Sequence, residues 1–151
     1  MRTRLPRAIF GFAAALALAV APASAAISVA AGAWLQDTPS QAGGAVLVSS
    51  GASIPSYPLD IQGTLAMPLT ARGGYALTAE IRGFTGGGYG GAYVGAGAGI
   101  GNLALGRAVG PVLTVFAGKS IAASTSIELR LYHSTTDGGS TAGFVGLRFT
   151  F

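Results

Sequence analysis

The sequence predicts an all-β fold: a closed, antiparallel transmembrane β-barrel of about eight strands, preceded by a cleaved signal peptide. Two observations predict it. The chain begins with an export signal, and its last nine residues, 143–151, alternate as a strand does. One face of that strand carries Val145, Leu147, Phe149 and Phe151, which suit hydrocarbon, while the other face is mixed. This two-residue period is typical of a strand with lipid on one side and a partly polar interior on the other.

Residues 1–25 have the composition of a signal peptide. Three arginines precede an apolar stretch at 8–20, and Ala23-Ser24-Ala25 gives the small-x-small pattern of a signal-peptidase site. A retained transmembrane helix is the alternative, but the apolar stretch is shorter than the ~20 residues that such a helix needs. We therefore expect cleavage after Ala25 and an outer-membrane β-barrel domain at 26–151.

Charge and cysteine content argue against several classes of function. The chain has nine Lys and Arg against five Asp and Glu, but three of the nine lie in the export signal, so residues 26–151 are nearly neutral. There is no basic patch that would indicate nucleic-acid binding. With no cysteine and one histidine, we expect no disulfide, no metal site and no cofactor.

Seven segments alternate clearly enough to predict strands, and turn-rich sequence separates them. In chain order these are residues 27–36, 57–67, 75–84, 91–101, 112–118, 126–133 and 143–151. Most are close to the ~9–11 residues that a tilted strand needs to cross a bilayer. An eighth segment, 45–50, is shorter and predicts only a weak strand.

Parity constrains the strand number, because bacterial single-chain barrels have an even number of strands. Eight is therefore favoured, and the eighth is either 45–50 or a segment that resembles a loop. One feature conflicts with this count. The link at 68–73 resembles a short periplasmic turn, which would require a further strand near the triglycine at 86–88. The register, and the face on which Trp34 lies, stay open.

Five charged residues fall on the inward faces of their strands. They are Glu80, Arg82, Glu128, Arg130 and Arg148. An eight-stranded barrel is just wide enough to be filled by its own side chains. We therefore expect these carboxylates and guanidiniums to pair with one another and to serve the structure. A narrow pore lined by charge is the alternative.

Two stretches carry a resemblance to a known family. The run Gly91-Ala92-Tyr93-Val94-Gly95-Ala96-Gly97-Ala98-Gly99-Ile100-Gly101, and the ending formed by 126–132 and 146–151, resemble strands of small bacterial outer-membrane β-barrel proteins, the eight-stranded porin-like and surface-protein superfamily. In that family the C-terminal aromatic strand is read by the outer-membrane insertion machinery. The resemblance implies that role for Leu147, Phe149 and Phe151.

The resemblance implies a structural or surface-interaction role, and we expect no catalytic activity. The expected partners are outer-membrane lipid, lipopolysaccharide and the insertion machinery, and the barrel is expected to be a monomer. An alternative is a lipid A-modifying hydrolase with a site near His133. Outer-membrane deacylases carry a His-x-Ser-Asn pattern, whereas this chain has His133-Ser134-Thr135-Thr136. Neighbouring residues on a strand point to opposite faces, so His133 and Ser134 are not expected to meet.

Overall fold

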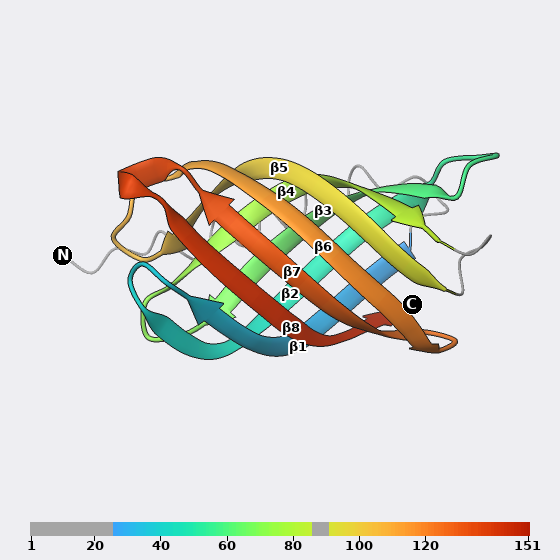
Figure 1. Cartoon of the computed structure of the whole chain (residues 1–151), viewed down its shortest axis with the longest axis horizontal. Coiled ribbons are helices and arrows are strands. Elements are labelled where there is room, and N and C mark those ends of the chain that lie inside the picture. Colours follow the sequence, from blue (N-terminus) through green and yellow to red (C-terminus); the bar gives the residue numbers. More distant parts are fainter. Residues whose placement is uncertain (1–25, 86–90) are drawn as a thin grey trace.

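The computed structural model describes residues 26–85 and 91–151, and it shows a barrel of eight strands (Figure 1). The predicted export signal at 1–25 and the triglycine at 86–88 lie outside the described residues. The strands are β1 (Ala26–Gln36), β2 (Gln41–Ser53), β3 (Leu59–Leu69), β4 (Gly73–Phe84), β5 (Ala92–Ala104), β6 (Gly110–Ala122), β7 (Thr125–Ser134) and β8 (Ser140–Thr150). A single turn of 3-10 helix, η1 (Thr136–Gly138), lies between β7 and β8.

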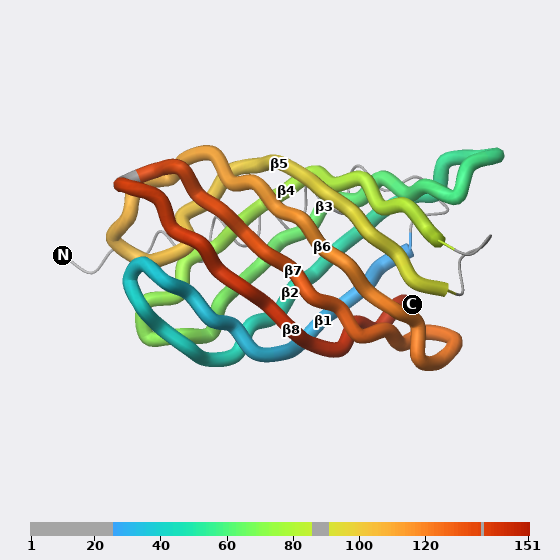
Figure 2. Tube along the Cα trace, viewed as in Figure 1, coloured from blue at the N-terminus to red at the C-terminus, as the bar shows by residue number. Residues whose placement is uncertain are grey.

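Each strand pairs antiparallel with its neighbour in sequence, and β8 pairs with β1 to close the sheet. The predicted closed antiparallel barrel is therefore confirmed. Figure 2 shows that the C-terminus and the start of β1 lie at the same end of the barrel, on the right. We call this the terminal end. The opposite end carries the links 37–40, 70–72, 105–109 and 135–139, and we call it the turn end.

The weak strand expected at 45–50 is in fact the full-length strand β2, with 13 residues. The alternating pattern covers only the middle of this strand, because its two flanks consist of glycines and other small residues. Two of these glycines, Gly43 and Gly51, lie where neighbouring residues leave no room for a Cβ. A Cβ at Gly51 would lie 2.6 Å from the carbonyl oxygen of Ile61, and one at Gly43 would lie 2.8 Å from the Thr70 methyl group.

The extra strand considered near the triglycine is not needed, because eight strands already close the barrel within the described residues. The link at 70–72 lies at the turn end, opposite the chain ends. A short link therefore does not by itself mark the end at which the chain termini lie. In this barrel most links at both ends are short.

The third strand begins at Leu59 rather than at residue 57. Tyr57 belongs to a turn, where its backbone N–H donates to the carbonyl oxygen of Ile54 (3.2 Å). Ser56 has a positive φ of 70°, which ends the extended backbone before Pro58.

The two faces of the sheet differ sharply in chemistry. Outward positions are mainly Ala, Val, Leu and Ile, and of the charged residues in the described strands only Lys119 points outward. Inward positions hold the remaining strand charges and most of the hydroxyls and amides. In the described residues, no helix is long and apolar enough to cross a membrane.

Gly99 and Gly63 form a matched pair for testing how closely the strands approach. A Cβ at Gly99 would lie 1.9 Å from the carbonyl oxygen of Leu77, whereas one at Gly63 would meet nothing within 4 Å. We expect Gly99→Ala to lower the free energy of unfolding by about 1–3 kcal/mol, because neighbouring backbone must shift. Gly63→Ala should leave it unchanged. Urea unfolding of the protein in detergent measures both, and equal stabilities would contradict this strand packing.

Candidate functional site: the charged interior and the turn end

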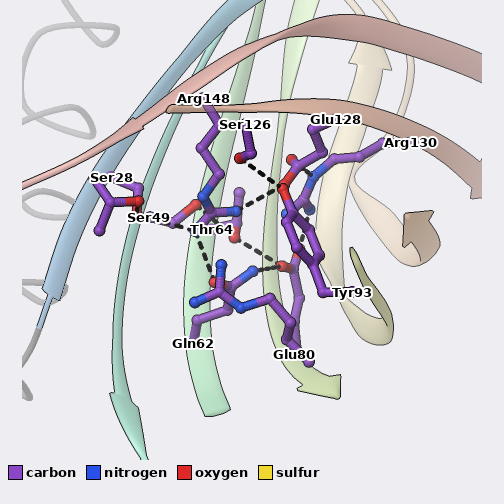
Figure 3. A network of polar contacts seen from close by, with 12 residues as sticks. Ser28, Ser49, Gln62, Thr64, Glu80, Tyr93, Ser126, Glu128, Arg130 and Arg148 are labelled. Atoms are coloured by element: carbon purple, nitrogen blue, oxygen red, sulfur yellow. Dashed lines mark hydrogen bonds and ion pairs between the residues drawn. The ribbon is translucent and has the colours of Figure 1, made fainter. Parts of the chain in front are cut away.

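Glu128 lies at the centre of a buried polar network (Figure 3). Its Oε1 accepts a hydrogen bond from Arg130 Nε (2.5 Å). Its Oε2 accepts from Arg148 Nη1 (2.9 Å) and from the Tyr93 hydroxyl (2.7 Å). The strands β5, β7 and β8 thus meet through one carboxylate.

Glu80 forms the second centre, from β4. Its Oε1 accepts from Arg130 Nη1 (2.6 Å) and from the Thr78 hydroxyl (2.6 Å). Its Oε2 accepts from Gln62 Nε2 (2.6 Å) and the Thr64 hydroxyl (2.9 Å). Both of its oxygens are therefore fully used.

Gln62 links the two centres into a closed circuit. While its amide N–H donates to Glu80, its Oε1 accepts from Arg148 Nη2 (2.8 Å), and Arg148 in turn donates to Glu128. The circuit Glu128–Arg130–Glu80–Gln62–Arg148 crosses the interior and joins β3, β4, β7 and β8.

Arg82 lies nearer the terminal end and pairs with Asp60. Its guanidinium carbon also lies 4.9 Å from the ring centroid of Phe84 and 5.2 Å from that of Tyr93. A planar cation over an aromatic face adds electrostatic attraction to the ion pair. Arg130 makes the same kind of contact with Phe116, at 4.1 Å.

All five residues that the sequence places inside do lie inside, and each has an opposite charge as its partner. Together with Asp60 they give three carboxylates and three guanidiniums, so the negative and positive charges of the interior are equal in number. Balance matters because an unpaired charge at this depth would cost several kcal/mol.

An apolar layer fills the interior on the turn-end side of this network. It consists of Trp34, Ala45, Leu47, Ala66, Ala76, Leu103, Val112, Tyr132, Ala142 and Phe144. Trp34 and Val112 have no exposed surface and Tyr132 has 1%. Trp34 therefore points inward, where its ring centroid lies 5.4 Å from that of Tyr132. Water does not reach these side chains.

Sequence reasoning missed the neutral members of the network: Gln62, Thr64, Thr78 and Tyr93 are buried hydrogen-bond partners of the charges, and Ser126 bonds to the Tyr93 hydroxyl. The alternation along each strand already predicts that these side chains point inward. It does not predict which charged groups they bond to, because that depends on the register between strands that are distant in sequence.

Leu147, Phe149 and Phe151 lie on the outward side at the terminal end, and each is exposed. The backbone N–H of Phe151 donates to the carbonyl oxygen of Ile27 (2.8 Å). The last residue of the chain therefore completes the seam between β8 and β1.

His133 and Ser134 lie on opposite faces of β7, as the strand geometry requires. His133 is exposed, and its Nδ1 lies 3.1 Å from the Thr141 hydroxyl across the β7–β8 pair. Ser134 is buried inside the barrel. The structure thus does not bring this histidine and serine together. Nor do the described residues contain a group of three or more His, Asp or Glu suited to a metal ion.

Hydrogen bonds join links of the turn end to the ends of neighbouring strands. The backbone N–H of Thr141 donates to Asp37 Oδ1 (2.7 Å), which lowers the pKa of that carboxyl below its usual value. The Thr70 hydroxyl donates to Gln41 Oε1 (2.8 Å), and Gln41 Nε2 donates to Gln36 Oε1 (2.9 Å). Neighbouring links are therefore held in fixed positions.

Comparison with solved structures shows which proteins share this architecture. Ail, the attachment invasion locus protein of Yersinia pestis, in complex with the heparin analogue sucrose octasulfate, aligns with a TM-score of 0.62 at 12% identity. The alignment covers 85% of this chain and 99% of Ail. A second structure of Ail gives 0.58 at 13% identity, over the same shares of the two chains.

Neisserial surface protein A aligns with a TM-score of 0.59 at 14% identity, over 84% of this chain and 96% of its own. The chain has the fold of these small outer-membrane barrels. At such low identity the likeness concerns the fold alone. No protein-family model matches the sequence, and a search of curated proteins finds no match.

Removing the Glu128 carboxylate tests the energetic weight of the network. Glu128→Ala would leave Arg130 and Arg148 facing each other with one carboxylate fewer between them. We expect a loss of about 3–5 kcal/mol in the free energy of unfolding, as for other broken buried ion pairs. Urea unfolding in detergent provides the measurement.

The matched control is Lys119→Ala, which removes an exposed charge and should change stability by less than about 0.5 kcal/mol. Glu128→Gln keeps the shape of the side chain and should fall between the two. An Ala variant as stable as the Lys119 control would show that the ion pairs do not hold the barrel together.

Proposed function

We propose that this protein is an integral barrel of a bacterial outer membrane, with a structural or surface-interaction role. The observation that carries the proposal is that polar and apolar side chains have exchanged the places they take in a water-soluble barrel. Charges point inward and pair, while large apolar side chains cover the outside, with Leu113, Val115 and Leu129 each more than half exposed. An exposed apolar surface that encircles a protein requires lipid or another apolar partner.

Strand length supports the same placement. The strands have 10 to 13 residues, enough for a tilted strand to cross a bilayer. Closure of the sheet supports it too, because hydrocarbon offers no partner to an unpaired backbone edge. In this arrangement the chain ends face the periplasm and the turn end faces outward.

The apolar layer supports a closed barrel rather than a pore. A conducting path would have to pass the level of Trp34, Val112 and Tyr132, which solvent does not reach. With the bore filled, the parts of the protein that can meet a partner are the outward face and the links at the ends. Ail and Neisserial surface protein A are named for attachment and for the cell surface, which agrees with a surface role.

Two narrower proposals concern the ends of the chain. Residues 1–25 act as an export signal that is removed, and Leu147, Phe149 and Phe151 present the outward pattern that the insertion machinery reads. Their exposure at the terminal end supports the second proposal.

The absence of cysteine from the chain allows a clean test of location and orientation. Ser40 lies in a link at the turn end and Ser124 in a link at the terminal end, and both are exposed. A membrane-impermeant maleimide should label Ser40→Cys on intact cells, and Ser124→Cys only after the outer membrane is permeabilised. Both variants should fractionate with outer membranes.

The outcomes separate the alternatives. Labelling of Ser124→Cys alone on intact cells would reverse the proposed orientation. Recovery of both variants in a soluble fraction would contradict the membrane placement.

A further inference from the structure

Three buried polar atoms without a hydrogen-bond partner lie where the polar network meets the apolar layer. They are the Thr114 hydroxyl oxygen, Arg130 Nη2 and the Tyr132 hydroxyl oxygen, and none of them has a partner within the described residues. The three residues are 2%, 0% and 1% exposed. Buried polar groups in proteins almost always bond to another protein group or to an ordered water. We call these three atoms the inner polar site.

Strand pairing brings the inner polar site together on one side of the bore. Thr114 of β6 lies directly opposite Tyr132 of β7, and Arg130 precedes Tyr132 by two positions on the same face of β7. Thr114 is also the partner of Gly97 on β5, and Gly97 is in turn the partner of Glu80 on β4. A Cβ at Gly97 would lie 2.6 Å from Glu80 Cγ. The absence of a side chain at Gly97 therefore lets Glu80 lean toward Thr114.

Two of the three guanidinium nitrogens of Arg130 already have partners. Its Nε donates to Glu128, and its Nη1 donates to Glu80 (2.6 Å). The Phe116 ring lies against the same group, with its centroid 4.1 Å from Cζ of Arg130. Because two carboxylates and a ring hold the guanidinium, it cannot turn to find an acceptor for the two N–H groups of Nη2.

The two hydroxyls of the site are also held in place and kept from solvent. The Tyr132 ring packs on Trp34, with 5.4 Å between their centroids. Val112, the next inward residue to Thr114 on β6, belongs to the apolar layer and has no exposed surface. The apolar layer therefore separates both hydroxyls from solvent at the turn end.

The other buried side-chain atoms without a partner in the described residues differ from these. They are Asp60 Oδ1, Arg82 Nε and Arg148 Nε, and they lie on the terminal-end side of the network. Each belongs to a charged group that is bonded through its remaining atoms. The hydroxyls of Thr114 and Tyr132, in contrast, are the only polar side-chain atoms of their residues.

The donors and acceptors of the inner polar site suit a water molecule. A guanidinium only donates and would repel a cation, whereas each hydroxyl can donate or accept. An anion would add a negative charge to an interior whose three carboxylates and three guanidiniums already cancel. Water is neutral, both donates and accepts, and makes about three hydrogen bonds when it is buried.

We propose that the inner polar site binds one enclosed water molecule, which accepts a hydrogen bond from Arg130 Nη2 and bonds to the hydroxyls of Thr114 and Tyr132. The water joins the polar network to the apolar layer, because Arg130 belongs to the network and Tyr132 to the layer. It thereby holds Tyr132 in its place across the bore. The site lies inside the closed barrel, so the proposal does not depend on the outer-membrane placement.

A crystal structure of the full barrel, purified in detergent, tests the proposal directly. We expect electron density for one water within hydrogen-bond distance of Arg130 Nη2 and of both hydroxyls. No density at this place, in a map that shows other ordered waters, would overturn the proposal. Crystals of protein refolded in bromide distinguish water from an anion, because an anomalous signal at the site would identify an anion and overturn the assignment.

Deleting the hydroxyls tests the energetic role of the same water. Removal of a hydroxyl without any partner should stabilise the barrel or leave its stability unchanged, whereas removal of one that holds the water should destabilise it. We expect Tyr132→Phe and Thr114→Val each to raise the unfolding equilibrium constant about threefold or more, measured at a fixed urea concentration in detergent. The matched control, Tyr75→Phe, deletes a hydroxyl on the outward face of β4 and should leave the constant unchanged.

The double variant Thr114→Val/Tyr132→Phe supplies a second criterion. Because both hydroxyls act through one water, its loss of stability should be smaller than the sum of the two single losses. Full additivity, or single variants at least as stable as the unaltered protein, would overturn the proposal. If a variant does not fold, the crystal structure of the unaltered protein still decides the question.

Discussion

Pairing of β1 with β8 is the constraint on which the rest of this structure depends. The two strands are in register from Ser28 opposite Thr150 to Gln36 opposite Ala142, and Phe151 adds a last backbone hydrogen bond to Ile27. Closing the sheet satisfies the two edges that would otherwise be exposed in hydrocarbon. It also fixes the width of the interior, because eight strands leave room for side chains and little else.

That narrow interior explains the unusual distribution of residue types. Charges that enter it must be neutralised by their neighbours, and the circuit through Glu128, Glu80 and Gln62 does this with nearly every oxygen in use. Bulky groups require space on adjoining strands, which inward glycines provide. A Cβ at Gly95 would lie 2.2 Å from the Phe116 ring, and one at Gly118 would lie 2.2 Å from the Tyr93 ring. Charge pairing and glycine placement are therefore two consequences of one geometric limit.

Alternation along the strands was sufficient to predict the fold class and the inward face of Glu80, Glu128 and Arg148, because a two-residue period is a local property. It failed for β2, whose glycine-rich flanks carry no alternation of their own and become strand through pairing with β1 and β3. The contact between the β3–β4 and β5–β6 links was equally hidden. The pairing of β4 with β5 places these links side by side, and the N–H of Leu105 then donates to the carbonyl oxygen of Arg72.

The most direct test of this account is heat-modifiability, with the protein extracted in detergent and run boiled and unboiled on a denaturing gel beside a circular dichroism spectrum. A closed barrel held by β1–β8 pairing and buried ion pairs should resist the denaturant until boiled. We expect a faster-migrating unboiled band and a β spectrum that is lost on boiling. Identical migration of the two samples, with full solubility of the folded protein in plain buffer, would contradict the account, because the outward apolar face would then belong to a soluble core.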